Sequence, residues 1–209
     1  FLGVDRSKTR VITCHLGNGS SMCAVENGKC IDTSMGITPL EGVIMGTRSG
    51  SMDPAVVQYI CNNEHISVDE MLTICNKKSG LLGISGLSSD MRDIDKAADE
   101  GNERANIARD MLVYGIRKYI GSYAAAMNGV DVIVFTAGIG ENNCALRERV
   151  MQGFEYLGAK LDPAKNAGCR EEAVISTDDS KVKICVIPTD EEIVIARDTL
   201  CIVTGKPIE

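Results

Sequence analysis

Aromatic and histidine side chains are scarce in this chain. Its 209 residues include no Trp, three Phe, five Tyr and two His, and the formal net charge is −7. Proteins that bind nucleic acid use basic surfaces for the phosphates and aromatic rings for stacking on the bases. The composition therefore predicts that the chain binds no nucleic acid, and a small molecule is the expected ligand.

Long apolar runs are lacking as well. The segment from Val130 to Ile139 is among the longest, and it is far shorter than the roughly 20 residues that span a bilayer. The N-terminus also lacks the succession of basic, apolar and small residues that marks a secretory signal. We therefore expect a cytoplasmic protein without a membrane partner.

Cysteine is frequent, but metal-binding spacings are missing. The cysteines are odd in number, form no Cys-x-x-Cys pair and lie mostly inside apolar strand or helix patterns. With only His15 and His65 as further candidate ligands, a zinc site is not expected. We expect reduced thiols at positions 14, 23, 30, 61, 75, 144, 169, 185 and 201.

The most informative segment is His15 to Ser21, because it turns the apolar strand pattern of Val11 to Cys14 into a glycine-rich turn. Gly17 and Gly19 permit positive φ and leave room for a close approach. The neutral donors that could bind an anion are the backbone N–H groups and the side chains of Asn18, Ser20 and Ser21. Because Asn-Gly is also common in ordinary hairpin turns, a phosphate-binding turn and a plain hairpin both fit this segment.

Short β-favouring runs open the chain and capped helices follow. The runs from Arg10 to Val25 and from Gly28 to Thr33 predict a three-stranded antiparallel meander. Asp53 caps a helix of about Pro54 to Asn62 that has proline at its first position. The capping box Ser67-x-x-Glu70 opens a second helix, which Gly80 closes.

Longer-range patterns fill the second part. After the polar stretch Ser88 to Asn102, apolar residues recur at helical spacing from Ala108 to Met127 and predict a long amphipathic helix. Val130 to Phe135 is typical of a strand buried on both faces, and it ends in the glycine-containing segment Thr136 to Asn142. A last strand, Val182 to Ile187, leads through a loop into a helix from Ile193 to Leu200.

This order of elements predicts a fold class. An antiparallel meander followed by helix-connected parallel strands indicates an α/β domain of the ribonuclease-H-like (actin-like ATPase) type with a mixed sheet. In such open sheets, ligands collect at the carboxyl ends of the strands.

Six segments, in one order along the chain, closely resemble motifs of the acetate kinase family. They are 15–21, 32–42, 45–54, 88–93, 135–142 and 188–192. The resemblance implies membership of the superfamily of acetate and sugar kinases, heat-shock chaperones and actin. Members of this family have two such domains in about twice this length, and this chain starts at Phe1. The resemblance therefore leads us to expect that residues 1–209 are a single C-terminal nucleotide-binding domain without its N-terminal domain.

The resemblance implies reversible transfer of the γ-phosphoryl group of ATP to acetate, directly and in line, giving acetyl phosphate and ADP. Such catalysis rests mostly on positioning and charge neutralisation. It implies that Arg48 is the transition-state arginine, since a planar guanidinium suits the phosphoryl oxygens. It also implies that His15 contacts the transferring group as a donor or cation, and that Pro39 lines the pocket for the methyl group of acetate. By residue type alone these are a loop arginine, a strand-end histidine and a turn proline.

The resemblance further assigns a nucleotide site. The phosphates would be held by Gly17, Asn18, Gly19 and Ser20. Asp90 would accept hydrogen bonds from the ribose hydroxyls while Met91 and Arg92 pack on the purine. The α-phosphate and ribose would be approached by the segment that includes Gly138, Ile139, Gly140 and Asn142.

A metal ion is the remaining expectation. The resemblance implies that Glu191 organises Mg²⁺ (or Mn²⁺) through a water molecule, because Mg²⁺ keeps part of its hydration shell in proteins. By position alone, Glu191 is a first-turn glutamate that stabilises a helix N-terminus. Asp90 likewise has the sequence context of a helix cap.

Motifs that the sequence lacks narrow the range of possible functions. Gly205-Lys206 is followed by Pro207, so the chain has no P-loop. The family's N-terminal active-site residues are also missing, so we expect this half to be inactive alone and, like the family, to form a homodimer. A propionate or butyrate kinase, another ATPase or carbohydrate kinase of the superfamily, and a non-catalytic nucleotide-binding or dimerisation module stay open.

Overall fold

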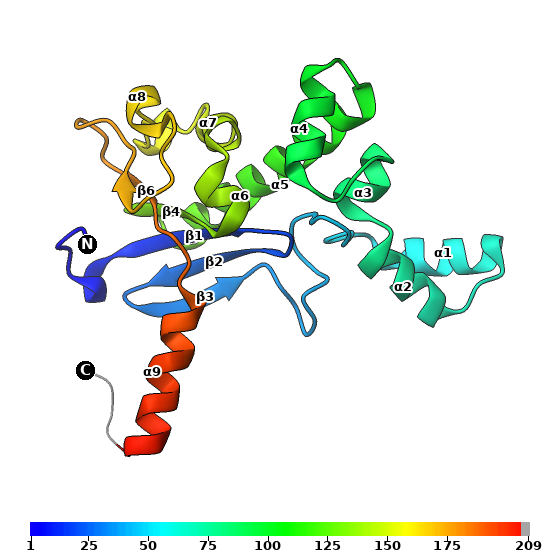
Figure 1. Cartoon of the computed structure of the whole chain (residues 1–209), viewed down its shortest axis with the longest axis horizontal. Helices are drawn as coiled ribbons and strands as arrows, with labels where there is room; N and C mark the ends of the chain where they lie inside the picture. Colours follow the sequence, from blue (N-terminus) through cyan, green and yellow to red (C-terminus); the bar gives the residue numbers. More distant parts are fainter. Residues whose placement is uncertain (206–209) are drawn as a thin grey trace.

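The computed structural model describes residues 1–205. It contains a mixed sheet with the strand order β3-β2-β1-β4-β6-β5 (Figure 1). β1, β2 and β3 form an antiparallel meander, β1, β4 and β6 run parallel, and β5 is an antiparallel edge strand. The strands are β1 (Arg10–Leu16), β2 (Ser20–Glu26), β3 (Lys29–Thr33), β4 (Val132–Thr136), β5 (Ala173–Val174) and β6 (Lys183–Val186). The predicted fold class is confirmed.

Helices connect the parallel strands and extend from the sheet on several sides (Figure 1). The helices of the described residues are η1 (Arg6–Lys8), α1 (Pro54–Glu64), α2 (Val68–Lys77), α3 (Gly80–Ser85), α4 (Met91–Asp99), α5 (Glu103–Ala126), α6 (Ala137–Asn142), α7 (Cys144–Met151), η2 (Glu155–Leu157), α8 (Pro163–Asn166) and α9 (Glu191–Thr204). None of the helices within residues 1–205 is long and apolar enough to cross a membrane.

The predicted capping residues are confirmed. Asp53 accepts a hydrogen bond from the N–H of Ala55 at the start of α1. In the capping box of α2, the Ser67 hydroxyl accepts from the N–H of Glu70 at 3.2 Å, and the Glu70 carboxylate accepts from the N–H of Ser67 at 2.8 Å. These interactions span three residues or fewer, which is why the sequence alone reveals them.

One local prediction was wrong. Gly80 does not close α2, which ends at Lys77; it opens α3 with φ +61°, and a Cβ there would lie 2.1 Å from the Met45 carbonyl oxygen. The polar stretch Ser88 to Asn102, for which no helix bounds were predicted, contains helix α4, and Asp90 caps this helix as its sequence context indicated. Its buried residues Met91, Ile94 and Ala98 provide about one apolar side chain per turn, too few to stand out among the charges.

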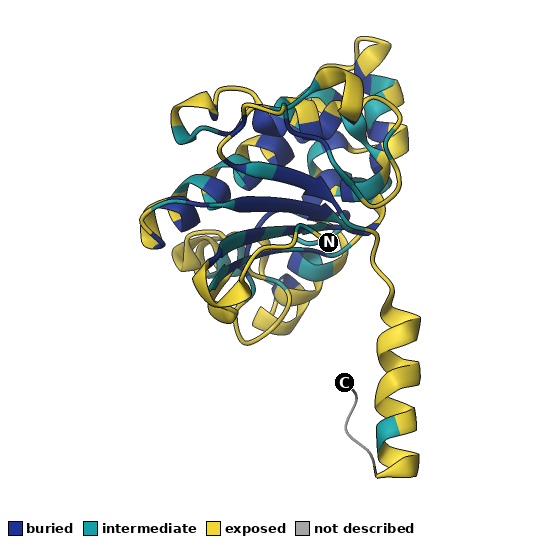
Figure 2. Ribbon diagram, turned by 90° about the vertical axis from the view of Figure 1, so that its left-hand side faces the viewer, coloured by how far each residue is buried: buried dark blue, intermediate teal, exposed yellow. Residues whose placement is uncertain are grey.

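The main core lies between the sheet and α5. The sheet side chains buried on this face are Ile12, Cys14, Leu16, Met22 and Ala24. From α5 they are covered by Ile116, Ile120 and Tyr123, all nearly inaccessible to solvent. Figure 2 shows the central strands buried between layers of more exposed structure. Burial of one such large apolar side chain contributes roughly 1.5–3 kcal/mol.

An ion pair fixes the start of the two central strands. The Arg10 guanidinium donates to both carboxylate oxygens of Asp131, at 2.7 Å and 3.1 Å, and to the Asn128 carbonyl. The N–H of Arg10 donates to the same carboxylate at 2.8 Å. The neighbouring guanidinium lowers the pKa of Asp131. The pair therefore anchors β1 to the loop that precedes β4.

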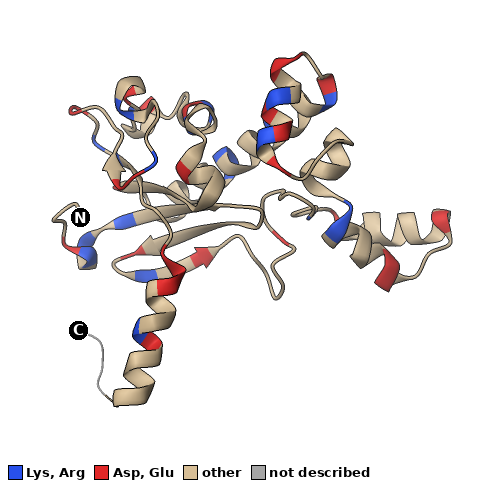
Figure 3. Ribbon diagram, viewed as in Figure 1, with Lys and Arg blue, Asp and Glu red and all other residues tan. Residues whose placement is uncertain are grey.

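Helix α9 extends away from the sheet instead of packing on it (Figure 1). Its side chains are largely apolar, with charges only at Glu191, Glu192, Arg197 and Asp198 (Figure 3). The exposed apolar residues are Ile193, Val194, Ile195, Leu200, Ile202 and Val203. A helix that is apolar on several sides is normally buried, so α9 has the character of a helix that packs against further protein.

The ends of β4 and β6 are joined by hydroxyl contacts around an unusual residue. Ala137 follows β4 with φ +64°, a left-handed conformation that disfavours a Cβ. Its N–H donates to the Thr189 hydroxyl at 3.0 Å, and that hydroxyl lies 2.7 Å from the Thr136 hydroxyl. Backbone strain of this kind persists where surrounding contacts impose it, often at functional sites.

The strain at Ala137 can be measured by substitution. We expect Ala137→Gly to raise the free energy of unfolding by up to about 1 kcal/mol, because glycine tolerates positive φ. Ala125→Gly, at an exposed position in α5, should instead lower it by about 1 kcal/mol. Urea denaturation measures both. A decrease of similar size in the two variants would contradict strain at Ala137.

Candidate functional site

The glycine turn between β1 and β2 is held together by its own hydrogen bonds. The N–H of Gly17 donates to the Gly19 carbonyl at 3.0 Å, and the buried Ser20 hydroxyl donates to the Gly17 carbonyl at 3.2 Å. Neither glycine adopts the positive φ that its type permits. At Gly19 the small size of glycine is what the structure uses, because a Cβ there would lie 3.2 Å from the Arg48 Nη1 atom.

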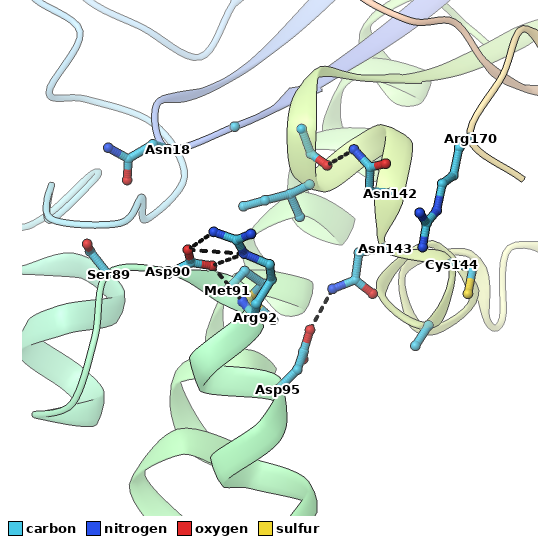
Figure 4. Close-up of a pocket in the computed structure, with 14 residues that line it drawn as sticks. Asn18, Ser89, Asp90, Met91, Arg92, Asp95, Asn142, Asn143, Cys144 and Arg170 are labelled. Atoms are coloured by element: carbon cyan, nitrogen blue, oxygen red, sulfur yellow. Dashed lines mark hydrogen bonds and ion pairs between the residues drawn. The ribbon is translucent and has the colours of Figure 1, made fainter. Parts of the chain in front are cut away.

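A cavity of about 910 Å³ lies beside this turn (Figure 4). Segments that are distant in sequence line it: the turn, the start of α4, the α6–α7 region and Arg170. The predicted site residues among its lining are Gly17, Asn18, Asp90, Met91, Arg92, Gly138, Ile139 and Asn142. The structure therefore brings most of the predicted nucleotide site together in one place.

Asp90 combines two roles in this cavity. Its carboxylate accepts from the N–H of Arg92 at 2.9 Å and so caps α4. It also accepts from the Arg92 guanidinium, at 3.0 Å from Nε and 2.5 Å from Nη2. The hydrogen bonds from Arg92 lower the pKa of Asp90 to about 2. The carboxylate is therefore ionised at neutral pH and remains available as a hydrogen-bond acceptor.

A second cavity, of about 550 Å³, lies at the ends of β1, β4 and β6. His15 and Glu191 both line it, together with further carboxylates from Glu141, Asp190 and Glu192. Gly138 lines both cavities, and a Cβ built on it meets no atom within 4 Å. The two cavities thus meet at Gly138, and the absence of a side chain there leaves the passage between them open.

Arg48 and Pro39 lie next to each other near the glycine turn. The Arg48 Nη1 atom donates to the Pro39 carbonyl at 3.2 Å and approaches the Met45 sulfur at 3.4 Å. Neither residue lines one of the two cavities. The loop that carries Arg48 is linked to the glycine turn by a backbone hydrogen bond, in which the N–H of Gly46 donates to the Asn18 carbonyl at 3.2 Å.

Some cavity residues were not predicted from the sequence. They are Ser89, Asp95, Asn143, Cys144, Ala145 and Arg170. Asp95 accepts from the Asn143 amide at 2.6 Å across the cavity wall (Figure 4), and burial raises the pKa of Asp95. Asn143 could have been recognised as a helix cap, since it accepts from the N–H of Leu146. Arg170 lies in an irregular segment and carries no comparable signal.

Ser20 and Gly140 do not line either cavity. The Ser20 hydroxyl is used inside the turn, and the Gly140 carbonyl accepts from a buried arginine behind α6. Among residues 1–205, no group of three or more His, Cys, Asp or Glu side chains converges closely enough to hold a metal ion.

The fold and the place of the cavities together define a class. Both cavities lie where parallel strands end, as expected for ligand sites in open α/β sheets. With its antiparallel meander extended by parallel strands, the chain is an α/β domain of the ribonuclease-H-like type.

Comparison with known proteins identifies the family. Residues 1–197 match the acetokinase family, and the chain belongs to it. It is 56% identical to the acetate kinase of Helicobacter hepaticus over 204 residues, which is 98% of this chain and 51% of that protein. The chain therefore spans about half the length of the curated relatives it matches.

Solved structures agree with this assignment. The crystal structure of Porphyromonas gingivalis acetate kinase is similar with a TM-score of 0.93 and 51% identity, covering 97% of this chain and 51% of the other. A propionate kinase from Francisella tularensis gives a TM-score of 0.84 and 44% identity, covering 90% of this chain and 48% of the other.

The state of Asp90 can be tested directly. We expect its carboxyl group to titrate near pH 2 because Arg92 stabilises the charged form, and to return toward its ordinary pKa of 3.8 in Arg92→Gln. A lowered pKa means that the ion pair favours the folded state above pH 3.8 and that this contribution is lost as the pH falls toward 2. Carboxyl-carbon NMR of both proteins measures the midpoints. Equal midpoints would contradict the role of Arg92.

Proposed function

We propose that this chain is the C-terminal, nucleotide-binding half of an acetate kinase. The complete enzyme would transfer the γ-phosphoryl group of ATP reversibly to acetate, giving ADP and acetyl phosphate. The observation that carries the proposal is the convergence of the family's motif segments, through Asn18, Asp90 and Gly138, on one cavity. Membership of the acetokinase family supports the same reaction.

In this proposal the larger cavity takes the nucleoside. The ionised Asp90 accepts hydrogen bonds from the ribose hydroxyls, and Met91 and Arg92 pack against the purine. The turn of Gly17 to Ser20 lies toward the phosphates, where Asn18 donates to the β- and γ-phosphate oxygens. Gly138 and Ile139 approach the α-phosphate and ribose through their backbone, and Asn142 completes this wall. Gly140, which the family resemblance assigns to the same segment, lies behind them and packs against β1 and β4.

The transferring phosphoryl group would lie between the turn and the second cavity. Arg48, adjacent to Gly19, neutralises its equatorial oxygens, and His15 contributes a further donor or cation. Pro39 borders the apolar site for the methyl group of acetate, next to Arg48. Direct in-line transfer then requires no covalent enzyme intermediate.

Glu191 is the proposed organiser of Mg²⁺ or Mn²⁺. It lines the second cavity with other carboxylates, and oxygen ligands are the type that these ions prefer. A single carboxylate fits an ion that is held mainly by phosphates and water. When bound, the ion would supply positive charge to the phosphate oxygens.

The rest of the active site would come from the N-terminal half of the complete protein. The family resemblance assigns to that half an arginine for the acceptor and an aspartate for the metal. The exposed apolar surface of α9 supports a covering partner of this kind. We also propose a homodimer through α5, whose exposed Ile107, Met111 and Tyr114 follow one helix face.

Two alternative functions are compatible with the same observations. The 44% identical propionate kinase structure supports a longer carboxylate, propionate or butyrate, as the acceptor. The other alternative is a nucleotide-binding or dimerisation module without catalysis, which would use the same cavity for the nucleotide. The free cysteines suit the reducing cytoplasm, where we place the protein.

Nucleotide binding tests the proposal at Gly138. We expect the chain to bind ADP, and Gly138→Ala to weaken binding at least tenfold because its Cβ enters the open space between the cavities. The variant should keep or gain thermal stability, since alanine favours the helix. Gly121→Ala, also without a contact within 4 Å, is the matched control in α5. Calorimetric titration showing no ADP binding to the unmodified chain would refute the site.

Catalysis tests the assignment as half of an enzyme. We expect the chain alone to make essentially no acetyl phosphate from ATP, Mg²⁺ and acetate, because positioning and charge stabilisation from the second half are absent. Hydroxylamine trapping measures the product, with full-length Helicobacter hepaticus acetate kinase at equal molarity as the positive control. Activity within tenfold of that enzyme would show that this chain holds a complete active site.

A further inference from the structure

Arg147 is the largest fully buried side chain of the described residues, with 0% of its surface exposed. It forms no ion pair with any residue in the range 1–205. Its five N–H donors are matched by five neutral acceptors: Asn166 Oδ1 (2.8 Å), Gly140 O (2.8 Å), Glu141 O (2.7 Å), Asn166 O (3.2 Å) and Cys169 O (3.0 Å). A buried arginine without a carboxylate partner is uncommon. Because every N–H group of Arg147 has an acceptor, the position of the guanidinium relative to these acceptors is closely fixed.

The guanidinium joins two segments that are separate in sequence. It lies in the first turn of α7 and reaches back across the break at Asn143 to the last carbonyls of α6. Its other donors bind the segment from Asn166 to Cys169. Asn166 completes the link, because its amide donates to the Cys144 carbonyl at 2.9 Å.

These two segments form one wall of the larger cavity. Asn142, Asn143 and Cys144 line the cavity at the α6–α7 break, and Arg170 lines it directly after the segment that Arg147 holds (Figure 4). Arg147 itself lies behind this wall and lines neither cavity. Its hydrogen bonds therefore connect the two segments that carry these lining residues.

Other side chains could not replace this arrangement. Burial lowers the pKa of Arg147, but arginine keeps its charge in proteins and presents its donors as a rigid planar fork. Lysine has three donors on a single nitrogen and cannot reach both segments with the same geometry. An apolar residue would donate no hydrogen bond to these buried acceptors, and leaving a buried carbonyl unpaired is unfavourable.

We propose that Arg147 is a positioning residue for the nucleoside end of the cavity. It holds the α6–α7 break and the 166–170 segment in the relative placement that nucleoside binding requires. The inference rests on the proposed function, since it takes the cavity to be the nucleotide site. It assigns Arg147 no contact with the ligand.

The test compares Arg147→Met and Arg147→Lys with Arg149→Met. Arg149 lies on the same helix, but its guanidinium pairs with Asp110 at the surface. Displacement of a fluorescent ADP analogue measures the Kd of ADP and of adenosine, at a temperature where circular dichroism shows every variant folded. We expect both Arg147 variants to raise both Kd values at least tenfold, and Arg149→Met to leave them within twofold of the unmodified chain.

Three results would overturn the inference. Arg147 variants that are less stable but keep Kd values within threefold would show a purely structural role. Full rescue by lysine would show that charge suffices. A loss confined to ADP, with adenosine unaffected, would show an electrostatic effect on the phosphates instead of positioning.

A second variant covers the case in which the Arg147 variants do not fold. Asn166→Leu keeps the branched shape of the side chain but removes one acceptor of Arg147 and the donor to the Cys144 carbonyl. At least threefold weaker binding of ADP and adenosine by the folded variant supports the inference, and unchanged binding overturns it. If the unmodified chain binds neither ligand, the proposed function fails, and this inference fails with it.

Discussion

The parallel pairing of β1 with β4 is the constraint on which the rest of the structure depends. His15 pairs with Thr136, so both strands end at the same level, and the Arg10–Asp131 ion pair holds their other ends. Because side chains alternate across a sheet, a slip of one residue would turn the core face of β1 toward the opposite side. Burial of that face against α5 therefore also determines that Gly17 and Ala137 meet, with 3.6 Å between a Cβ on Gly17 and that of Ala137.

Three glycines determine the shape of the cavities and of the loops beside them. A Cβ on Gly19 would press on Arg48, and one on Gly46 would lie 2.1 Å from the Asn18 Oδ1 atom. These glycines let three backbone segments approach each other closely. Gly138 has the opposite use, since it leaves space where the two cavities meet. Polar groups and charges from different segments can therefore converge on a ligand.

The exposed apolar surfaces fit a chain that spans half the length of its relatives. Helix α9 begins at Glu191, beside the second cavity, and then leaves the sheet with its apolar residues exposed (Figure 2). A protein segment that covered α9 would therefore lie close to the second cavity.

The sequence by itself determined the meander, the caps of α1 and α2, the long helix and the motif residues of the cavity. These features rest on local patterns: alternation, helical spacing and hydrogen bonds over two or three residues. The tertiary structure alone decided the placement of α9, the strain at Ala137 and the neighbourhood of Arg147. The acceptors of Arg147 come from both α6 and the segment from Asn166 to Cys169, and only the packing of α7 beside them makes an ordinary helical arginine a buried link.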